Sequence, residues 1–304
     1  MNFFFTESFW FMVLRCLTPI LFATLATIVA NTSGFYFLGI EGCMTIAALF
    51  GVLGSGFSGS LFIGLLCGLS SGVLYSLLLG YSVMHLRANT IITGIVMNLA
   101  VSGGSEFLLY TLTGDKNASN SLQSLSFPNV NIPFVQDIPV LGKILSGQNL
   151  LTYLAILAAV AIFFLLRDSS FGIKIRSVGE APQAAESVGI RVNRVRYQAL
   201  FLSGVLASLG GMYLSMGYIN RFTTGMVAGR GYISLATQAM SGSNSLLGIL
   251  SSFLYAFGNS ISIHLQNLGL DPYLITIIPY LFISIFYVVF SVAKMNREKA
   301  RFTT

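Results

Sequence analysis

Long apolar runs dominate this sequence, and they restrict the folds that it can adopt. Eight of them reach or approach the ~20 residues with which a helix crosses ~30 Å of hydrocarbon. They cover residues 9–30, 35–53, 61–81, 90–112, 150–166, 197–218, 246–265 and 273–293. The apolar–polar alternation of membrane barrel strands is absent. We therefore expect an all-α, polytopic transmembrane bundle of about eight to ten helices.

Composition agrees with a membrane protein. Only 9% of the 304 residues are charged, against about a quarter in soluble domains. The first apolar run follows Glu7 and contains Arg15, which is the wrong charge pattern for a cleaved secretory signal, so a retained helix is expected. The three cysteines lack metal-site spacing, and we expect no metal and no cofactor. The +6 net charge is divided among several loops, which argues against nucleic acid as a partner.

The distribution of basic residues predicts the orientation of the chain. Lysines and arginines gather near Arg87, in the segment 167–196 and in the tail 294–304, and such clusters mark the cytoplasmic side. Residues 1–304 are thus expected to form one transmembrane domain with about nine passes. The expected external segments are 54–60, 113–149 and 220–229, and the expected internal ones are 31–34, 85–89, 167–196, 241–245 and 294–304.

Small residues and short apolar stretches predict close packing and broken helices. Glycine or serine recurs at every fourth position from Gly56 to Gly80, which predicts one continuous helix face for close backbone approach. The stretch 232–240 is too short to cross the membrane alone and is interpreted as half of a broken helix.

Four polar side chains within the apolar runs are candidates for the path of a solute: Glu41, Asn98, Gln238 and Asn259. A carboxylate at membrane depth is costly. The glycines on both sides of Glu41 would allow the unwound backbone of a discontinuous helix there. The alternative is that each of these groups holds helices together through hydrogen bonds, and for Glu41 both interpretations stay open.

The segment 167–196 is unusual because it is long, polar and basic. Within it, Pro182 suits the start of a helix and Gly189 suits its end. A helix from about 181 to 188 would be only ~12 Å long and too short to be stable alone. Such an element is suited to being gripped by another protein.

The residues of this segment carry a family resemblance. The string "GEAPQAAESVGI" resembles the cytoplasmic coupling-helix motif of permease subunits of bacterial ABC importers, in the branch of ribose, simple-sugar and nucleoside permeases. "SGFYFLGIEGCMTIAALFG" resembles a second motif of that family, and "DIPVLGKI" resembles the external loop of its nucleoside subgroup. The resemblance implies a coupling element that docks in a groove of an ATPase. Its residues would be Gly179, Glu180, Pro182, Ala184, Ala185, Gly189 and Ile190.

The resemblance also implies a function and a set of partners. The chain would be the permease subunit of an importer in the bacterial cytoplasmic membrane, carrying a nucleoside or a simple sugar. Its partners would be one or more ABC ATPase subunits, a second permease subunit (a different chain rather than a second copy) and an external solute-binding lipoprotein. The sequence has no phosphate-binding loop and no nucleophile–base set, so it is not expected to be an enzyme. Two alternatives are a proton-coupled secondary transporter or facilitator, with Glu41 and Glu106 as proton carriers, and a structural membrane scaffold.

Overall fold

The computed structural model describes residues 7–122, 124–131, 144–242, 244–267, 275 and 277–302; for 267 and 293–302 it describes the backbone only. Helices account for nearly all of the regular structure. The elements are α1 (Glu7–Thr32), α2 (Ile40–Ser58), α3 (Leu61–Met84), α4 (Thr90–Thr113), β1 (Asn129–Val130), β2 (Gln148–Asn149), α7 (Leu150–Asp168), α8 (Ser170–Glu180), α9 (Pro182–Ser187), α10 (Val192–Met212), the π-helix η2 (Tyr213–Tyr218), α11 (Arg230–Ser241), α12 (Ser245–Asn267) and α14 (Ile278–Phe302).

The helices confirm the predicted membrane bundle. Seven helices of the described chain are long and apolar enough to cross a membrane: α1, α2, α3, α4, α7, α10 with η2, and α12. The eighth apolar run begins outside the described residues and continues as α14. The short stretch 232–240 lies within α11, which has only 12 residues and is bounded by Gly229 and Gly242, both in left-handed conformation. The half-helix predicted there is confirmed as a short separate element.

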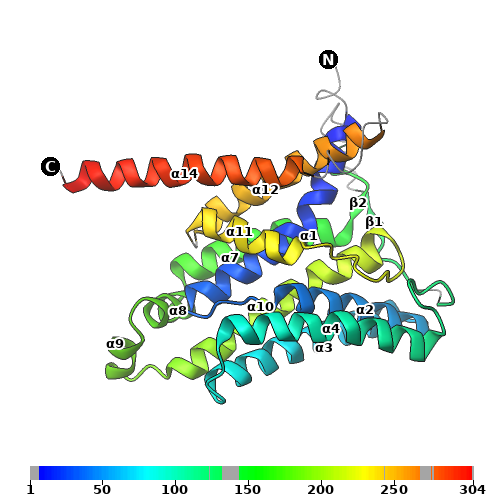
Figure 1. Ribbon diagram of the computed structural model, residues 1–304, viewed down its shortest axis with the longest axis horizontal. Coiled ribbons are helices and arrows are strands. Elements are labelled where there is room, and N and C mark those ends of the chain that lie inside the picture. Colours follow the sequence, from blue (N-terminus) through cyan, green and yellow to red (C-terminus); the bar gives the residue numbers. More distant parts are fainter. Residues whose placement is uncertain are drawn as a thin grey trace.

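The centre of the bundle is formed by α1 and α10. Every residue of α1 from Leu17 to Ala30 is buried, and α1 packs on α10, α12, α11 and α7. Figure 1 shows α2, α3 and α4 on one side of this centre and α12 and α14 on the other. Only 28% of the α3 span and 17% of the α4 span are buried, so these helices present most of their surface outward.

The two ends of the bundle collect different connections. Figure 1 places α8 and α9 at one end and the two-stranded antiparallel pair β1–β2 at the other. The loop after α4 pairs with the loop before α11 through an isolated bridge between Ala118 and Thr223. These two loops were both predicted to be external, and they do lie at the same end. Residues 132–143, the second half of the predicted external loop, lie outside the described residues.

The small-residue stripe is shorter than predicted. The chain reverses between α2 and α3, so Gly56 lies on α2 and Ser60 only precedes α3. The close approach is real from Gly64 to Gly80. A Cβ on Gly64 would lie 2.8 Å from the carbonyl oxygen of Gly51 on α2, and one on Gly72 would lie 2.0 Å from Oγ of Ser208 on α10. The four-residue spacing alone could not reveal that a turn interrupts it.

Candidate functional site

The predicted coupling element is a short helix at one end of the bundle (Figure 1). Pro182 is the first residue of α9, where its missing N–H is no loss. The helix ends at Ser187, and Gly189 follows with φ +85°, a conformation that disfavours side chains. The N–H of Ile190 donates to the carbonyl of Ala185 (3.0 Å) and closes the last turn. The sequence placed this helix correctly to within one residue at each end.

The two central alanines of α9 differ in exposure. Ala185 is 3% exposed and belongs to the main core, whereas Ala184 is exposed. Glu180 and Gly189 are also exposed, and Pro182 and Ile190 are half-buried. Val188 is 76% exposed at the tip of the element. The outward face of α9 therefore carries Ala184 and Val188, and the sequence interpretation had not singled out Val188.

A tight backbone contact joins the base of this element to the rest of the bundle. A Cβ on Gly179 would lie 2.1 Å from the carbonyl oxygen of Thr32 and 3.1 Å from the nitrogen of Gly34. On the other side of the contact, Nε of Arg196 donates to the carbonyl of Ser33 (3.3 Å). The end of α1, the end of α8 and the start of α10 thus meet around one turn of backbone.

Glu41 caps a helix. It lies in the first turn of α2, and its carboxylate accepts hydrogen bonds from the N–H groups of Gly229 (2.8 Å, to Oε1) and Gly231 (2.7 Å, to Oε2). These donors are the N-terminal amides of α11, where the helix dipole favours a negative charge. The unwound backbone predicted on both sides of Glu41 is confirmed only before it, because α2 begins at Ile40 and Gly42 is helical.

Asn98 joins four segments through four hydrogen bonds. Its Oδ1 accepts from the N–H of Gly42 (2.9 Å) and from the hydroxyl of Tyr75 (3.0 Å). Its Nδ2 donates to the carbonyl of Leu38 (3.0 Å) and to the hydroxyl of Tyr232 (3.0 Å). Every hydrogen-bonding position of the amide is used. We call this network the Asn98 hub. Within it, the amide of Asn98 has no free hydrogen-bonding position with which to bind a solute.

The other two candidates are not among the partners of Asn98 in the hub. Gln238 is buried in α11, with 8% of its surface exposed. Asn259 is half-buried on α12 and lies near the Cys16 thiol on α1. The structure thus brings Glu41 and Asn98 together at the start of α2, and the hydrogen bonds described for these two side chains include neither Gln238 nor Asn259.

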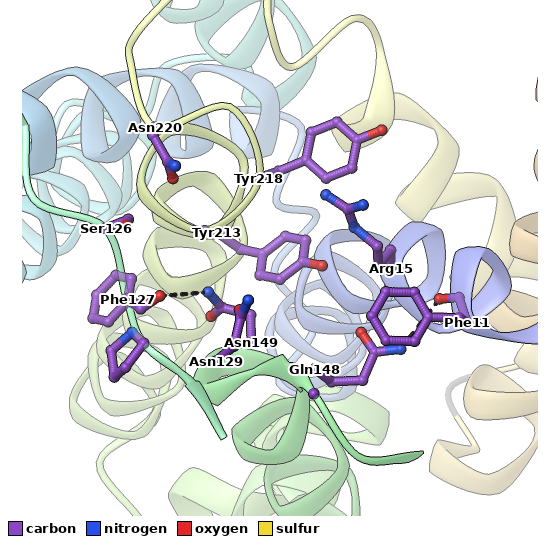
Figure 2. A pocket seen from close by; sticks show the side chains of 13 residues that line it. Phe11, Arg15, Ser126, Phe127, Asn129, Gln148, Asn149, Tyr213, Tyr218 and Asn220 are labelled. Atoms are coloured by element: carbon purple, nitrogen blue, oxygen red, sulfur yellow. Dashed lines mark hydrogen bonds between the residues drawn. The ribbon is translucent and has the colours of Figure 1, made fainter. Parts of the chain in front are cut away.

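A polar cavity of about 310 Å³ opens at the opposite end from α9, between α1, η2 and the β1–β2 pair. Figure 2 shows Arg15, Tyr213, Tyr218 and Gln148 around it, with Nδ2 of Asn149 donating to the carbonyl of Phe127 (2.9 Å). π-helices are rare and often mark functional sites. The sequence interpretation missed this cavity, because its lining comes from segments more than 100 residues apart. The described part of the chain contains no cluster of His, Cys, Asp and Glu that could hold a metal.

Comparison with known proteins gives the family. The profile of the family described as "Branched-chain amino acid transport system / permease component" matches residues 9–293. The nucleoside ABC transporter permease protein NupC of Lactococcus lactis is 34% identical over 81% of this chain and 79% of its own length. The guanosine ABC transporter permease protein NupQ of Bacillus subtilis is 31% identical over 81% of this chain and 78% of its own length.

A solved structure supports the same fold. It is an inward-facing ABC transporter of the metal-chelate type, with a TM-score of 0.50 and 14% identity, and the similarity covers 93% of this chain and 85% of that one. At this identity the likeness concerns the fold alone. Together with the helices that span a membrane, these findings identify a multi-pass ABC-importer permease subunit. The chain belongs to the branched-chain amino acid transport system permease family.

Proposed function

We propose that this chain carries a nucleoside across the bacterial cytoplasmic membrane and is driven by a separate ABC ATPase that grips α9. The observation that carries the proposal is the form of α9. Its outer face is small and exposed at Ala184 and Val188, which suits insertion into a groove, while Ala185 anchors the same helix in the core.

The contacts around Gly179 provide a route from the ATPase to the membrane. A force on α9 reaches α8 directly and α1 through the backbone contact of Gly179 with Thr32 and Gly34. The turn at Gly34 leads into α2, whose first turn contacts α11 through Glu41. Movement of α9 would therefore bias helices on both sides of the bundle rather than one loop.

A nucleoside is the favoured cargo. Both relatives above are named as nucleoside or guanosine permeases, and about a third of the aligned residues are identical in this chain. A nucleoside is uncharged, which agrees with a bundle that has few charged residues. The proposed partners are an ABC ATPase, a second and different permease subunit, and an external solute-binding lipoprotein. The largely unburied α3 and α4 leave room for a neighbouring subunit.

The test is uptake by the reconstituted transporter with its ATPase. Ala184→Trp places a large ring on the exposed face of α9, and we expect nucleoside uptake to fall at least ~10-fold while the permease still inserts and remains folded, because a groove fitted to a methyl group cannot admit an indole. Lys116→Trp, on an exposed loop at the other end, is the control and should leave uptake unchanged. Normal uptake and normal ATP hydrolysis with Ala184→Trp would contradict docking on this face.

A further inference from the structure

The cavity at the β1–β2 end of the bundle contains an arginine whose guanidinium has no hydrogen-bond acceptor among the described residues. Arg15 lies on α1, and its guanidinium carbon is 4.5 Å from the centre of the Tyr218 ring. Within the described residues, the guanidinium of Arg15 interacts with the Tyr218 ring, and none of its N–H groups donates to a protein oxygen. An arginine with five donors that faces a cavity in an apolar bundle calls for an acceptor.

The groups around Arg15 converge on the same space. Figure 2 shows the guanidinium, the Tyr213 ring and the Gln148 side chain pointing toward one another from α1, η2 and β2. Gln148 is 1% exposed, and its Nε2 donates to the carbonyls of Phe11 (3.2 Å) and Ile144 (3.3 Å). That orientation leaves its Oε1 as an acceptor on the cavity side. The cavity therefore offers planar surfaces, a fork of donors and an opposing acceptor.

The charge of the lining favours an uncharged ligand over an anion. Among the described residues that line the cavity, Arg15 is the one with a formal charge. The adjoining cavity shares Arg15, Phe11 and Tyr218, and it is lined in addition by Glu7. A phosphate would meet a single guanidinium with a carboxylate nearby, whereas a neutral ring with two adjacent acceptors would use the guanidinium fork without carrying charge into the site.

We propose that this cavity binds an oxopurine nucleoside, with the Arg15 guanidinium donating to N7 and O6 of the base and an aromatic ring of Tyr213 or Tyr218 against its face. The same bidentate pairing of arginine with N7 and O6 is the commonest specific contact to guanine in nucleic-acid recognition. Adenine has an amino donor in place of O6 and would oppose the guanidinium. The cavity volume of about 310 Å³ lies at the small end of ligand pockets. The proposal rests on the proposed function, because it names the substrate class of the same permease.

Equilibrium binding of labelled guanosine to the full-length chain in lipid nanodiscs tests the site. We expect guanosine and inosine to compete equally, and adenosine and cytidine to bind at least ~10-fold more weakly. Arg15→Lys keeps the charge but loses the fork, and it should weaken guanosine binding ~10-fold. Arg15→Gln should weaken it further. Arg221→Gln is the control, because Arg221 is exposed at the same end and its Nη1 donates to Asn120 (3.1 Å) outside the cavity lining.

Several outcomes would overturn the assignment. They are equal competition by adenosine and guanosine, stronger competition by inorganic phosphate than by inosine, an unchanged affinity in folded Arg15→Lys, and no guanosine binding to the unmodified chain. Thermal unfolding of each variant separates lost binding from lost folding. Uptake by the complete transporter separates the two proposals. If nucleosides are taken up but Arg15→Lys does not alter the preference for guanosine over adenosine, only the site is wrong. If no nucleoside is taken up, the proposed function is wrong.

Discussion

Asn98 shows how one amide can replace several missing backbone partners. It satisfies the N–H of Gly42, an early amide of α2 that no helical carbonyl can reach, and the carbonyl of Leu38 in the turn before α2. It also accepts from Tyr75 and donates to Tyr232. Because the side chain is 6% exposed, water cannot easily replace these bonds. The role of Asn98 is therefore structural in the observed conformation.

Replacement of Asn98 by leucine should be strongly destabilising. Asn98→Leu leaves two backbone groups and two tyrosine hydroxyls without their partner, and a buried unsatisfied group costs about 1–3 kcal/mol each. We expect a loss of about 3 kcal/mol or more, seen as a lower midpoint of thermal unfolding in nanodiscs. Ser105→Ala is the control on the same helix, because buried Ser105 donates only to Ser102 one turn earlier. Equal midpoints for the two variants would contradict the hub.

Glu41→Gln distinguishes a helix cap from a proton carrier. The amide keeps one acceptor oxygen for Gly229 or Gly231 but loses the second and the charge, so the start of α11 should weaken by about 1–3 kcal/mol. Uptake should decrease but remain dependent on ATP. Glu106, which is exposed on α4, provides the control as Glu106→Gln and should unfold like the unmodified chain. Two results together would favour a secondary transporter. Uptake would stop in Glu41→Gln although its stability is unchanged, and uptake by the unmodified chain would stop when the proton gradient is dissipated while ATP is high.

At the scale of elements, two glycines of the predicted coupling element should behave differently. Gly179→Ala would place a methyl group 2.1 Å from the backbone oxygen of Thr32, so α8 and α1 must move apart. Gly189→Ala meets open space and introduces only the strain of a positive φ, about 1 kcal/mol. We expect Gly179→Ala to lower the number of nucleosides moved per ATP hydrolysed and Gly189→Ala to preserve it. A similar ratio in both variants would argue against transmission through this contact.

The sequence predicted the positions of the helices along the chain better than it predicted which helices pack against each other. Apolar length correctly predicted seven helices that are long enough to cross a membrane, because crossing hydrocarbon requires both length and apolarity. The described part of the eighth run lies on α14. Proline and glycine located α9, because each has a specific conformational role at a helix end. The helix α8 was missed: it is short, and its polar and apolar residues look like an ordinary loop until Gly179 packs against Thr32.

The candidate site was predicted only in part, for a related physical reason. Glu41 and Asn98 could be recognised as polar groups in apolar runs, but their partners Gly229, Gly231 and Tyr232 lie more than 100 residues away. The cavity beside Arg15 depends on the same kind of distant contact, between α1, η2 and β2. Nothing in the spacing along the chain encodes which of several equally apolar helices become neighbours. Helix existence is a local property, and the lining of a cavity is not.

The whole molecule has two distinct ends, and their assignment to the two sides of the membrane can be measured. One end carries α8 and α9, and the other carries the paired loops around Ala118 and Thr223 (Figure 1). The basic segment 167–196 predicts that the first end is cytoplasmic. Lys116→Cys and Val188→Cys place reactive thiols on exposed positions of the two ends. The buried Cys43 and the half-buried Cys16 and Cys67 are replaced beforehand by serine or alanine.

A membrane-impermeant maleimide should label Lys116→Cys in intact cells and Val188→Cys only after the membrane is opened. The reason is the number of membrane crossings between these segments. The chain crosses twice, through α7 and α10 with η2, between the loop after α4 and the loop before α11, so these loops share a side. It crosses once, through α7, between the loop after α4 and α9, so these lie on opposite sides. Labelling of Val188→Cys in intact cells would show that the molecule is oriented the opposite way in the membrane. The ATPase could not then reach α9, and the cavity beside Arg15 would face the cytoplasm and could not receive a nucleoside from outside. The orientation is thus the premise that the coupling element and the oxopurine site share, and one pair of cysteines tests it for both.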